Sequence, residues 1–139
     1  MHQMVFINLP VSDLNRSREF FTALGYTFDE KVCQDGTSLG VILGPNMYAM
    51  LLDRKFFDSF HDARTAEPGR HEVITCLTAE SREQVDTHVE KALAAGATAV
   101  RAEEQGDWMF YRSFADPDGH LWEIMWMDDA KATAAGALG

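Results

Sequence analysis

The stretch FADPDGHLWEIMW, residues 114–126, places a carboxylate where it could do chemistry. Its second half alternates like a β-strand, and the residues around Glu123 on both faces of that strand are mostly large and apolar. A carboxylate in such surroundings costs several kcal/mol unless it is paired, coordinated or protonated. Glu123 is therefore the candidate catalytic residue, and the sequence must indicate what faces it.

The turn before this strand predicts one partner for the carboxylate. The residues DPDG, 116–119, have the composition of a type I turn, and such a turn would close a β-hairpin. If the first and last residues of the turn face each other, Arg112 lies opposite Glu123 on the same face of the sheet. An arginine can donate two parallel hydrogen bonds to a carboxylate, so a partly buried ion pair is the hypothesis. A bulge of one residue would bring Ser113 or Tyr111 opposite Glu123 instead.

Length, composition and charge exclude several classes of protein for this chain. The chain has 139 residues, of which 46% are hydrophobic, as in a globular protein with one core. No apolar stretch is long enough to span a bilayer, and we expect a cytoplasmic protein. The formal net charge of -10 argues against nucleic acid or an anionic membrane as a partner. Cys33 and Cys76 form no disulfide framework and are expected to be small buried thiols.

The two halves of the chain repeat one order of elements. Residues 4–11 are strand-like, and a helix follows that Ser12 or Asp13 can cap and Gly25 can end. Residues 71–80 are again strand-like, and the helix that follows begins at Ser81 and ends at Gly96. Three further strand-like runs come after each glycine, namely 26–33, 37–44 and 47–53 in the first half and 97–104, 108–115 and 120–127 in the second.

The pattern is therefore βαβββ followed by βαβββ, and it predicts an α+β fold. We expect a first module with its connecting segment at 1–66, a second module at 67–128 and a flexible tail at 129–139, together forming one compact domain. Phe56, Phe57 and Phe60 have helical spacing within the connection. A short helix packed on the sheet is one interpretation of them, and a lid over a pocket is the alternative.

This doubled pattern, the opening FINLPVSDLNRSREFFTALGY and the closing FADPDGHLWEI resemble the vicinal oxygen chelate superfamily. It includes glyoxalase I, extradiol dioxygenases, fosfomycin-resistance enzymes and bleomycin-resistance proteins, and the chain is most similar to the bacterial proteins called lactoylglutathione lyase-related. The resemblance implies two tandem βαβββ modules that form a curled mixed sheet around a cavity. It also implies a small-molecule ligand and a homodimer.

Metal-dependent members of the family hold a divalent ion with side chains from the first and last strands of each module. Glu123 matches the ligand in the last strand of the second module. The other three positions fall on Phe6, seven residues before Asp13, on Met50 and near Val73. Because divalent ions need several oxygen or nitrogen donors, we expect no metal, and a metal site built on Glu123 is the less favoured alternative.

The ion pair of Glu123 and Arg112 could be a structural part of the family scaffold without chemistry. In the alternative, the pair lies on the floor of a mostly apolar pocket with a few polar groups, as in small-molecule sites. Glu123 would act as general base and Arg112 would hold an anionic group of the ligand. The expected substrate-binding residues are Phe6, Asn8, Tyr48, Met50, Val73, Thr75, Arg112 and Met125. Two functions stay open: an enzyme of the lyase or dioxygenase type, or a metal-free protein that binds or sequesters a small molecule without catalysis.

Overall fold

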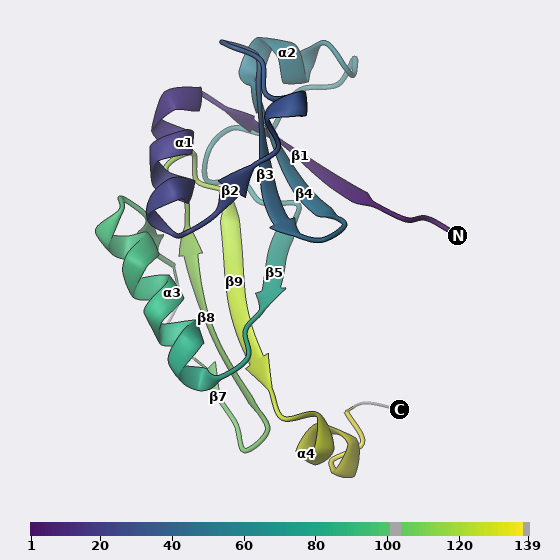
Figure 1. The fold of residues 1–139 in the computed structure, drawn as a ribbon, viewed down its shortest axis with the longest axis vertical. Coiled ribbons are helices and arrows are strands. Elements are labelled where there is room, and N and C mark those ends of the chain that lie inside the picture. Colours follow the sequence, from purple (N-terminus) through teal and green to yellow (C-terminus); the bar gives the residue numbers. More distant parts are fainter. Residues whose placement is uncertain (101–103, 138–139) are drawn as a thin grey trace. The chain divides into compact units, whose positions relative to one another are not determined.

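The structure is a computed structural model, and it describes residues 1–100 and 104–137. By its internal contacts the chain divides into two compact units, Met1–Arg70 and His71–Gly139. Each unit contains one copy of the predicted repeat (Figure 1). Within the described residues, no helix is both long enough and apolar enough to cross a membrane.

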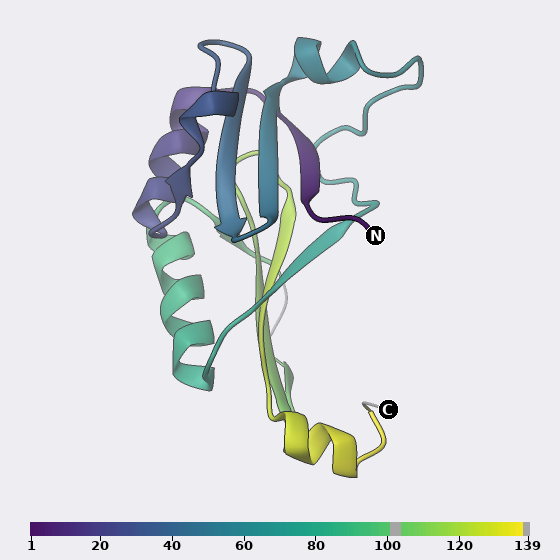
Figure 2. The same cartoon turned by 45° about the vertical axis from the view of Figure 1, so that its right-hand side comes forward.

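The first unit is a four-stranded sheet with α1 packed on one face (Figure 2). Its strands lie in the order β1-β4-β3-β2, with β1 parallel to β4 and the other neighbours antiparallel. The elements are β1 (Val5–Val11), α1 (Leu14–Ala23), β2 (Thr27–Phe28), the 3-10 helix η1 (Glu30–Val32), β3 (Ser38–Gly44), β4 (Met47–Asp53) and α2 (Arg54–Asp58).

The second unit repeats this topology, with strands in the order β5-β9-β8-β6 and β7 also paired to β8. Its elements are β5 (Ile74–Thr78), α3 (Arg82–Ala94), β6 (Thr98–Ala99), β7 (Glu104–Gln105), β8 (Met109–Ala115), β9 (Leu121–Met127) and α4 (Asp129–Ala134). The predicted α+β fold and its tandem βαβββ order are confirmed. Among residues 1–100 and 104–137, neither sheet closes into a barrel. Part of the strand predicted at 97–104 falls on residues 101–103, which lie outside the described residues.

The ends of the two long helices agree with their sequences. The side chain of Asp13 accepts a hydrogen bond from the backbone N–H of Arg16 at 3.0 Å, so Asp13 is the N-cap of α1. Ser81 caps α3 in the same way through Gln84, at 3.1 Å. Gly25, which follows α1, has a positive φ of 96°, a conformation that glycine adopts without the strain other residues meet.

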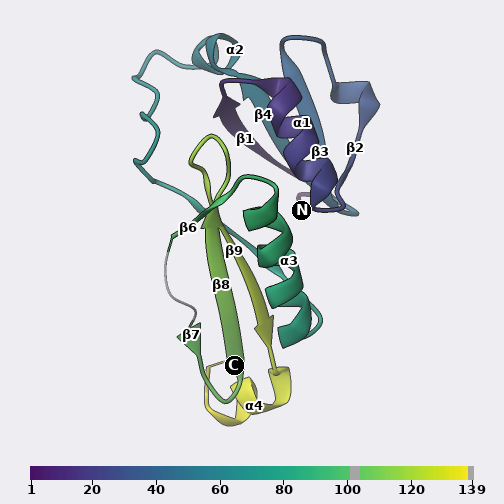
Figure 3. The same ribbon diagram turned by 90° about the vertical axis from the view of Figure 1, so that its left-hand side faces the viewer.

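Each sheet buries the face on which its long helix packs (Figure 3). In the first unit, this core contains Phe20, Phe21, Leu39, Val41, Ala49 and Leu51. In the second unit, it contains Val85, Val89, Ala92, Phe110, Phe114, Trp122 and Ile124. We call the opposite side of each sheet its far face. Side chains alternate along a strand, so the residues between these core positions point to the far face.

The connecting segment begins with the predicted short helix. Phe56 and Phe57 lie in α2, and the ring centroids of Phe56 and Phe60 are 4.9 Å apart. Phe60 is nevertheless 67% exposed, and the role of this segment as a lid stays a prediction. The stretch 129–139, predicted to be a flexible tail, starts with the helix α4, whose Ala132 is buried.

Gly40 in β3 has no space for a side chain. A Cβ atom at this position would overlap Cγ2 of Val32 in η1 and would lie 3.5 Å from the sulfur of Met50. We therefore expect Gly40→Ala to destabilise the protein by about 1 to 3 kcal/mol, measured by urea denaturation, because η1 must move. Gly106→Ala is the matched control, since its Cβ would approach no heavy atom closer than 3.7 Å. Equal stability of the two variants would contradict this account of the packing.

Candidate functional site

The turn between β8 and β9 sets which side chain faces Glu123. The backbone N–H of Asp116 donates to the carbonyl of His120 at 2.9 Å, and that of Gly119 donates to the carbonyl of Asp116 at 2.8 Å. Gly119 has a φ of +85°. The loop is thus a type I turn followed by a left-handed glycine, which is one residue longer than the two-residue loop that the sequence suggested. As a result, Ser113 lies opposite Glu123.

The predicted ion pair between Arg112 and Glu123 is therefore wrong. Arg112 lies opposite Ile124, on the face covered by α3. Its Nη1 is 2.9 Å from Oδ1 of Asp86, and its Nη2 is 2.8 Å from Oε1 of Glu90. Partial burial alone would lower the pKa of Arg112, but the hydrogen bonds to these two carboxylates outweigh it and raise the pKa. The guanidinium joins β8 to α3 and points away from the face of Glu123.

A second carboxylate holds the turn in place. Asp116 is 5% exposed and accepts three hydrogen bonds of 3.0 Å, from the backbone N–H groups of Asp118 and His120 and from Nε1 of Trp122. Burial raises the pKa of Asp116, while His120 and these hydrogen bonds oppose the rise. Since Trp122 directly precedes Glu123 in β9, this network fixes the position from which the Glu123 side chain projects.

Glu123 lies on the far face of the second sheet, between two polar side chains. Ser113 of β8 is its register partner on one side and Cys76 of β5 on the other. Leu121 and Met125, two residues away along β9, share its face. Glu123 is half-buried, and within residues 1–100 and 104–137 it makes no hydrogen bond or ion pair. The sequence thus placed Glu123 in a strand correctly, but it did not identify its neighbours there.

The two cysteines have different surroundings. Cys76 is exposed, so the expectation of a buried thiol is wrong for it. Crowding by its neighbours removes water from the thiol and raises its pKa, and the negative charge of Glu123 raises it further. Cys33 is partly buried, with its Sγ 3.3 Å from the carbonyl oxygen of Asp29 and 3.4 Å from the backbone N–H of Gly40. Cys33 also has a neighbouring carboxylate, that of Glu30, but of the two thiols only Cys76 is exposed.

The first unit brings together four of the predicted substrate-binding residues. Phe6 and Asn8 of β1 lie beside Tyr48 and Met50 of β4, all on the far face. The rings of Phe6 and Tyr48 are stacked with their centroids 4.9 Å apart. Phe6, the second residue of β1, is 45% exposed, which is unusual for a large apolar side chain in a strand.

The positions predicted in β5 were displaced by one residue. Val73 precedes the strand, and Thr75 lies in register with Trp122 on the buried side, where it is 8% exposed. The expectation that Thr75 shares a face with Glu123 is therefore wrong. The helix cap could have given the correct position in β5. Counting seven residues back from Ser81, as from Asp13 in the first half, gives Ile74. Met125 lies on the predicted face.

The side chains at the family's metal-ligand positions do not fit a divalent metal. Beside Glu123, these positions hold Phe6, Met50 and Ile74, none of which offers an oxygen or nitrogen donor. Within the described part of the chain, no three His, Cys, Asp or Glu residues form a group that could hold a metal ion. A carboxylate and a single neighbouring thiol fall short of the four or more donors that such ions take.

Comparisons with solved structures show which proteins share this fold. The fold matches a hypothetical protein from S. aureus, with 28% identity, 91% of this chain and 94% of that chain covered, and a TM-score of 0.75. It also matches a lactoylglutathione lyase from Agrobacterium tumefaciens (16% identity, 88% and 92% covered, TM-score 0.65) and a fosfomycin resistance protein from Mesorhizobium loti (12%, 96% and 98%, 0.67). A search of curated proteins found no match.

The family model of the Glyoxalase/Bleomycin resistance protein/Dioxygenase superfamily matches residues 3–124. The chain belongs to this superfamily, which confirms the resemblance inferred from the motifs. The two functionally described neighbours are less than 25% identical to this chain, so their similarity extends to the fold alone.

Asp116→Asn tests the network that fixes the turn. An asparagine keeps one acceptor oxygen but presents an amide NH2 group where the second carboxylate oxygen accepts from Trp122. We expect a loss of about 1 to 3 kcal/mol in the free energy of unfolding, measured by urea denaturation, because a buried donor loses its acceptor. The exposed Asp107→Asn is the control and should be neutral. An unchanged stability of Asp116→Asn would show that the turn does not depend on this carboxylate.

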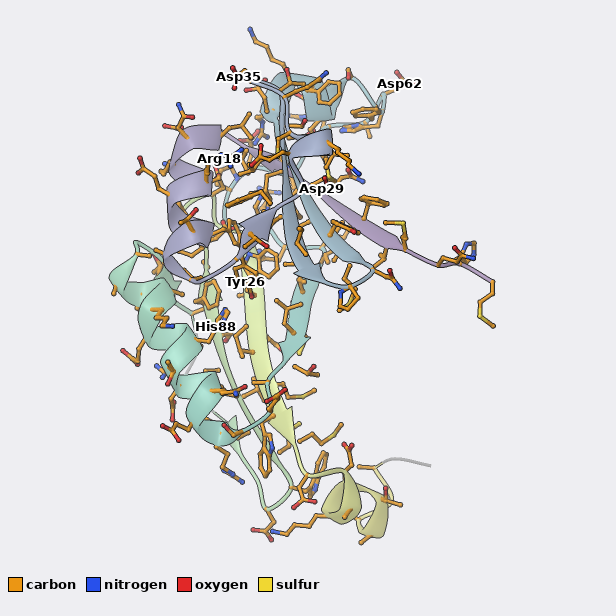
Figure 4. All side chains as sticks on the ribbon, in the orientation of Figure 1. Arg18, Tyr26, Asp29, Asp35, Asp62 and His88 are labelled. Carbon is orange, nitrogen blue, oxygen red and sulfur yellow. The ribbon has the colours of Figure 1, made fainter. Side chains whose placement is uncertain are left out.

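His88 makes stability depend on pH. It projects from α3 (Figure 4), is half-buried, and its ring centroid lies 6.4 Å from that of Phe114. Burial, and next the charge of Lys91, lower its pKa, so the fold favours the neutral imidazole. Its contribution to stability is complete above the unfolded pKa of about 6.5 and is lost as the pH falls through that value toward the lower folded pKa.

Urea denaturation of the wild type and His88→Gln between pH 8 and pH 5 measures this contribution. The wild type should lose more stability than the variant as the pH falls below about 6.5. Parallel pH profiles for the two proteins would contradict the inferred environment of His88.

Proposed function

We propose that this protein binds a small molecule on the far face of its second sheet without a catalytic metal. The observation that carries the proposal is Glu123, a half-buried carboxylate with no hydrogen bond or ion pair within the described residues, flanked by Leu121 and Met125. Small-molecule sites combine apolar side chains with a few polar groups in this way. The ligand would place an apolar body on the sheet and a polar group at the carboxylate.

The charge of Glu123 narrows the class of ligand. Removing a carboxylate from part of its water without a partner costs free energy. A hydrogen-bond donor or a cation on the ligand offsets that cost. An anionic group would add repulsion instead. We therefore propose a ligand with a cationic or hydrogen-bond-donating group, in place of the anion that the mispaired Arg112 had suggested.

Further proposals rest on the family resemblance. Phe6, Asn8, Tyr48 and Met50 are proposed to contact a small molecule on the far face of the first sheet. The protein is proposed to be a cytoplasmic homodimer. A lyase that uses a divalent metal is the alternative function. The side chains at the family's metal-ligand positions disfavour such a lyase, since Phe6, Met50 and Ile74 are apolar.

Three benzyl compounds test the ligand class by backbone amide NMR. Benzylamine should shift the amides around Glu123, benzyl alcohol should do so more weakly, and phenylacetate should not bind. Glu123→Gln should weaken benzylamine binding by about tenfold, equivalent to about 1.4 kcal/mol, because the acceptor charge is gone. Glu83→Gln, an exposed α3 residue with the same charge change, should leave binding unchanged. Equal binding of amine and carboxylate, or shifts confined to other residues, would refute the proposal.

Melting temperatures with zinc, manganese or nickel test the alternative. A metal at 100 times its dissociation constant adds about 2.7 kcal/mol to stability. We expect no such rise. A rise that Glu123→Gln abolishes would favour the metal-dependent lyase instead.

A further inference from the structure

The first sheet ends in a long strand with an open side. Among the described residues, β1 pairs with β4 alone, so its other side forms the edge of the sheet (Figure 2). We propose that two copies of this chain associate through this edge, with β1 of one copy antiparallel to β1 of the other. The inference rests on the proposed homodimer, to which it assigns an interface, and it does not depend on the ligand proposed for the second sheet.

The backbone of β1 presents hydrogen-bonding groups for such a pairing. The N–H of Val5 donates to the carbonyl oxygen of Asn46 at 2.9 Å, so the backbone groups of Val5 point toward β4. Successive residues of a strand point their backbone groups to opposite sides. The N–H and C=O groups of Met4, Phe6 and Asn8 therefore point to the open edge.

The same three residues define the register of the pair. With Phe6 opposite Phe6 of the second copy, Met4 lies opposite Asn8 of that copy, and each of these pairs can exchange two backbone hydrogen bonds. The next outward position is Pro10, which has no N–H, so the hydrogen-bonded ladder ends there. This register uses every outward N–H between Met4 and Pro10, and it brings the two Phe6 rings into a cross-strand aromatic pair.

Exposed apolar side chains lie along this edge on both faces of the sheet. Met4, Val5 and Phe6 are 49%, 47% and 45% exposed, and Met47, the register partner of Val5, is 43% exposed. Val5 and Phe6 point to opposite faces, and α1 packs mainly on β3 and β4. A second strand beside β1 would cover these side chains, and their burial would stabilise the dimer.

The distribution of charge favours association through the first unit. This unit contains nine acidic and seven basic side chains, whereas the second unit contains 13 acidic and five basic ones. Two copies that meet through their first units therefore repel each other less. Residues 1–11 contain no Asp, Glu, Lys or Arg. Charged side chains commonly protect edge strands from pairing with another chain, and β1 has no such protection.

The association closes at two copies. Because β1 pairs with itself across a twofold axis, each copy uses its whole β1 edge in the dimer. The opposite edge of the first sheet is β2, which has only two residues, and short edge strands are poor templates for pairing. The far face of the sheet stays accessible to a ligand, since the backbone pairing is made at the edge.

Sedimentation equilibrium of three variants tests the position of the interface. Phe6→Lys places two like charges opposite each other, and Asn8→Pro removes an outward N–H without removing a hydrogen bond to β4. We expect each substitution to raise the dissociation constant of the dimer at least about tenfold. Val73→Lys is the matched control, because it adds the same charge at an apolar residue that is 58% exposed and lies outside β1, and it should leave the constant unchanged.

Disulfide crosslinking tests the register without placing a charge or a proline in the edge. In a Cys33→Ser, Cys76→Ser background, Phe6→Cys places two thiols opposite each other at a Cα separation of about 5.5 Å, which a disulfide can span. We expect a covalent dimer on a denaturing gel after oxidation. Thr27→Cys, an exposed position in β2 at the opposite edge, should stay monomeric on that gel. Equal crosslinking of the two variants would overturn the proposal.

The outcomes distinguish this interface from the proposals on which it rests. A wild-type chain that sediments as a monomer would refute both the homodimer and the β1 interface. A dimer that survives Phe6→Lys and Asn8→Pro, or that only Val73→Lys dissociates, would refute the β1 interface and leave the homodimer standing. Melting temperatures show whether each variant is folded, and benzylamine binding at Glu123 tests the proposed ligand separately.

Discussion

The hydrogen bonds of the buried Asp116 carboxylate fix the turn between β8 and β9, and the side chains around Glu123 depend on this turn. Three donors converge on this side chain from the turn and from Trp122, and the turn they hold contains three residues between its closing pair. Because side chains alternate along a strand, one residue more or less in this turn would exchange the two faces of β8 relative to β9. The network therefore decides that Ser113, and not Arg112, faces Glu123.

The separation of charges across the second sheet follows from that register. On the face covered by α3, Arg112 bonds to Asp86 and Glu90, so the cation is satisfied by the helix. On the far face, Glu123 lies beside a thiol and a hydroxyl, and no cation of residues 1–100 or 104–137 pairs with it. A structural ion pair would have explained Glu123 fully. Its absence makes a ligand-binding role for the carboxylate the better hypothesis.

Periodicity and caps predicted most of the fold, because they depend on local sequence. Asp13 and Ser81 cap the helices as expected, and the repeat and its superfamily are confirmed. The site was predicted less well, because strand register depends on turn geometry. Gly119 was taken as the end of a type I turn, whereas its positive φ makes it the extra residue of a longer loop. A separate error of one residue, in the position of β5, put Thr75, and not Cys76, beside Glu123.

On the far face, Glu123 lies between Ser113 and Cys76, and no arginine in the described part of the chain pairs with the carboxylate. Nuclear Overhauser contacts in isotope-labelled protein measure this directly. We expect backbone contacts between Ser113 and Glu123 across β8 and β9, and side-chain contacts between Cys76 and Glu123. Backbone contacts between Arg112 and Glu123, with none between Ser113 and Glu123, would contradict it.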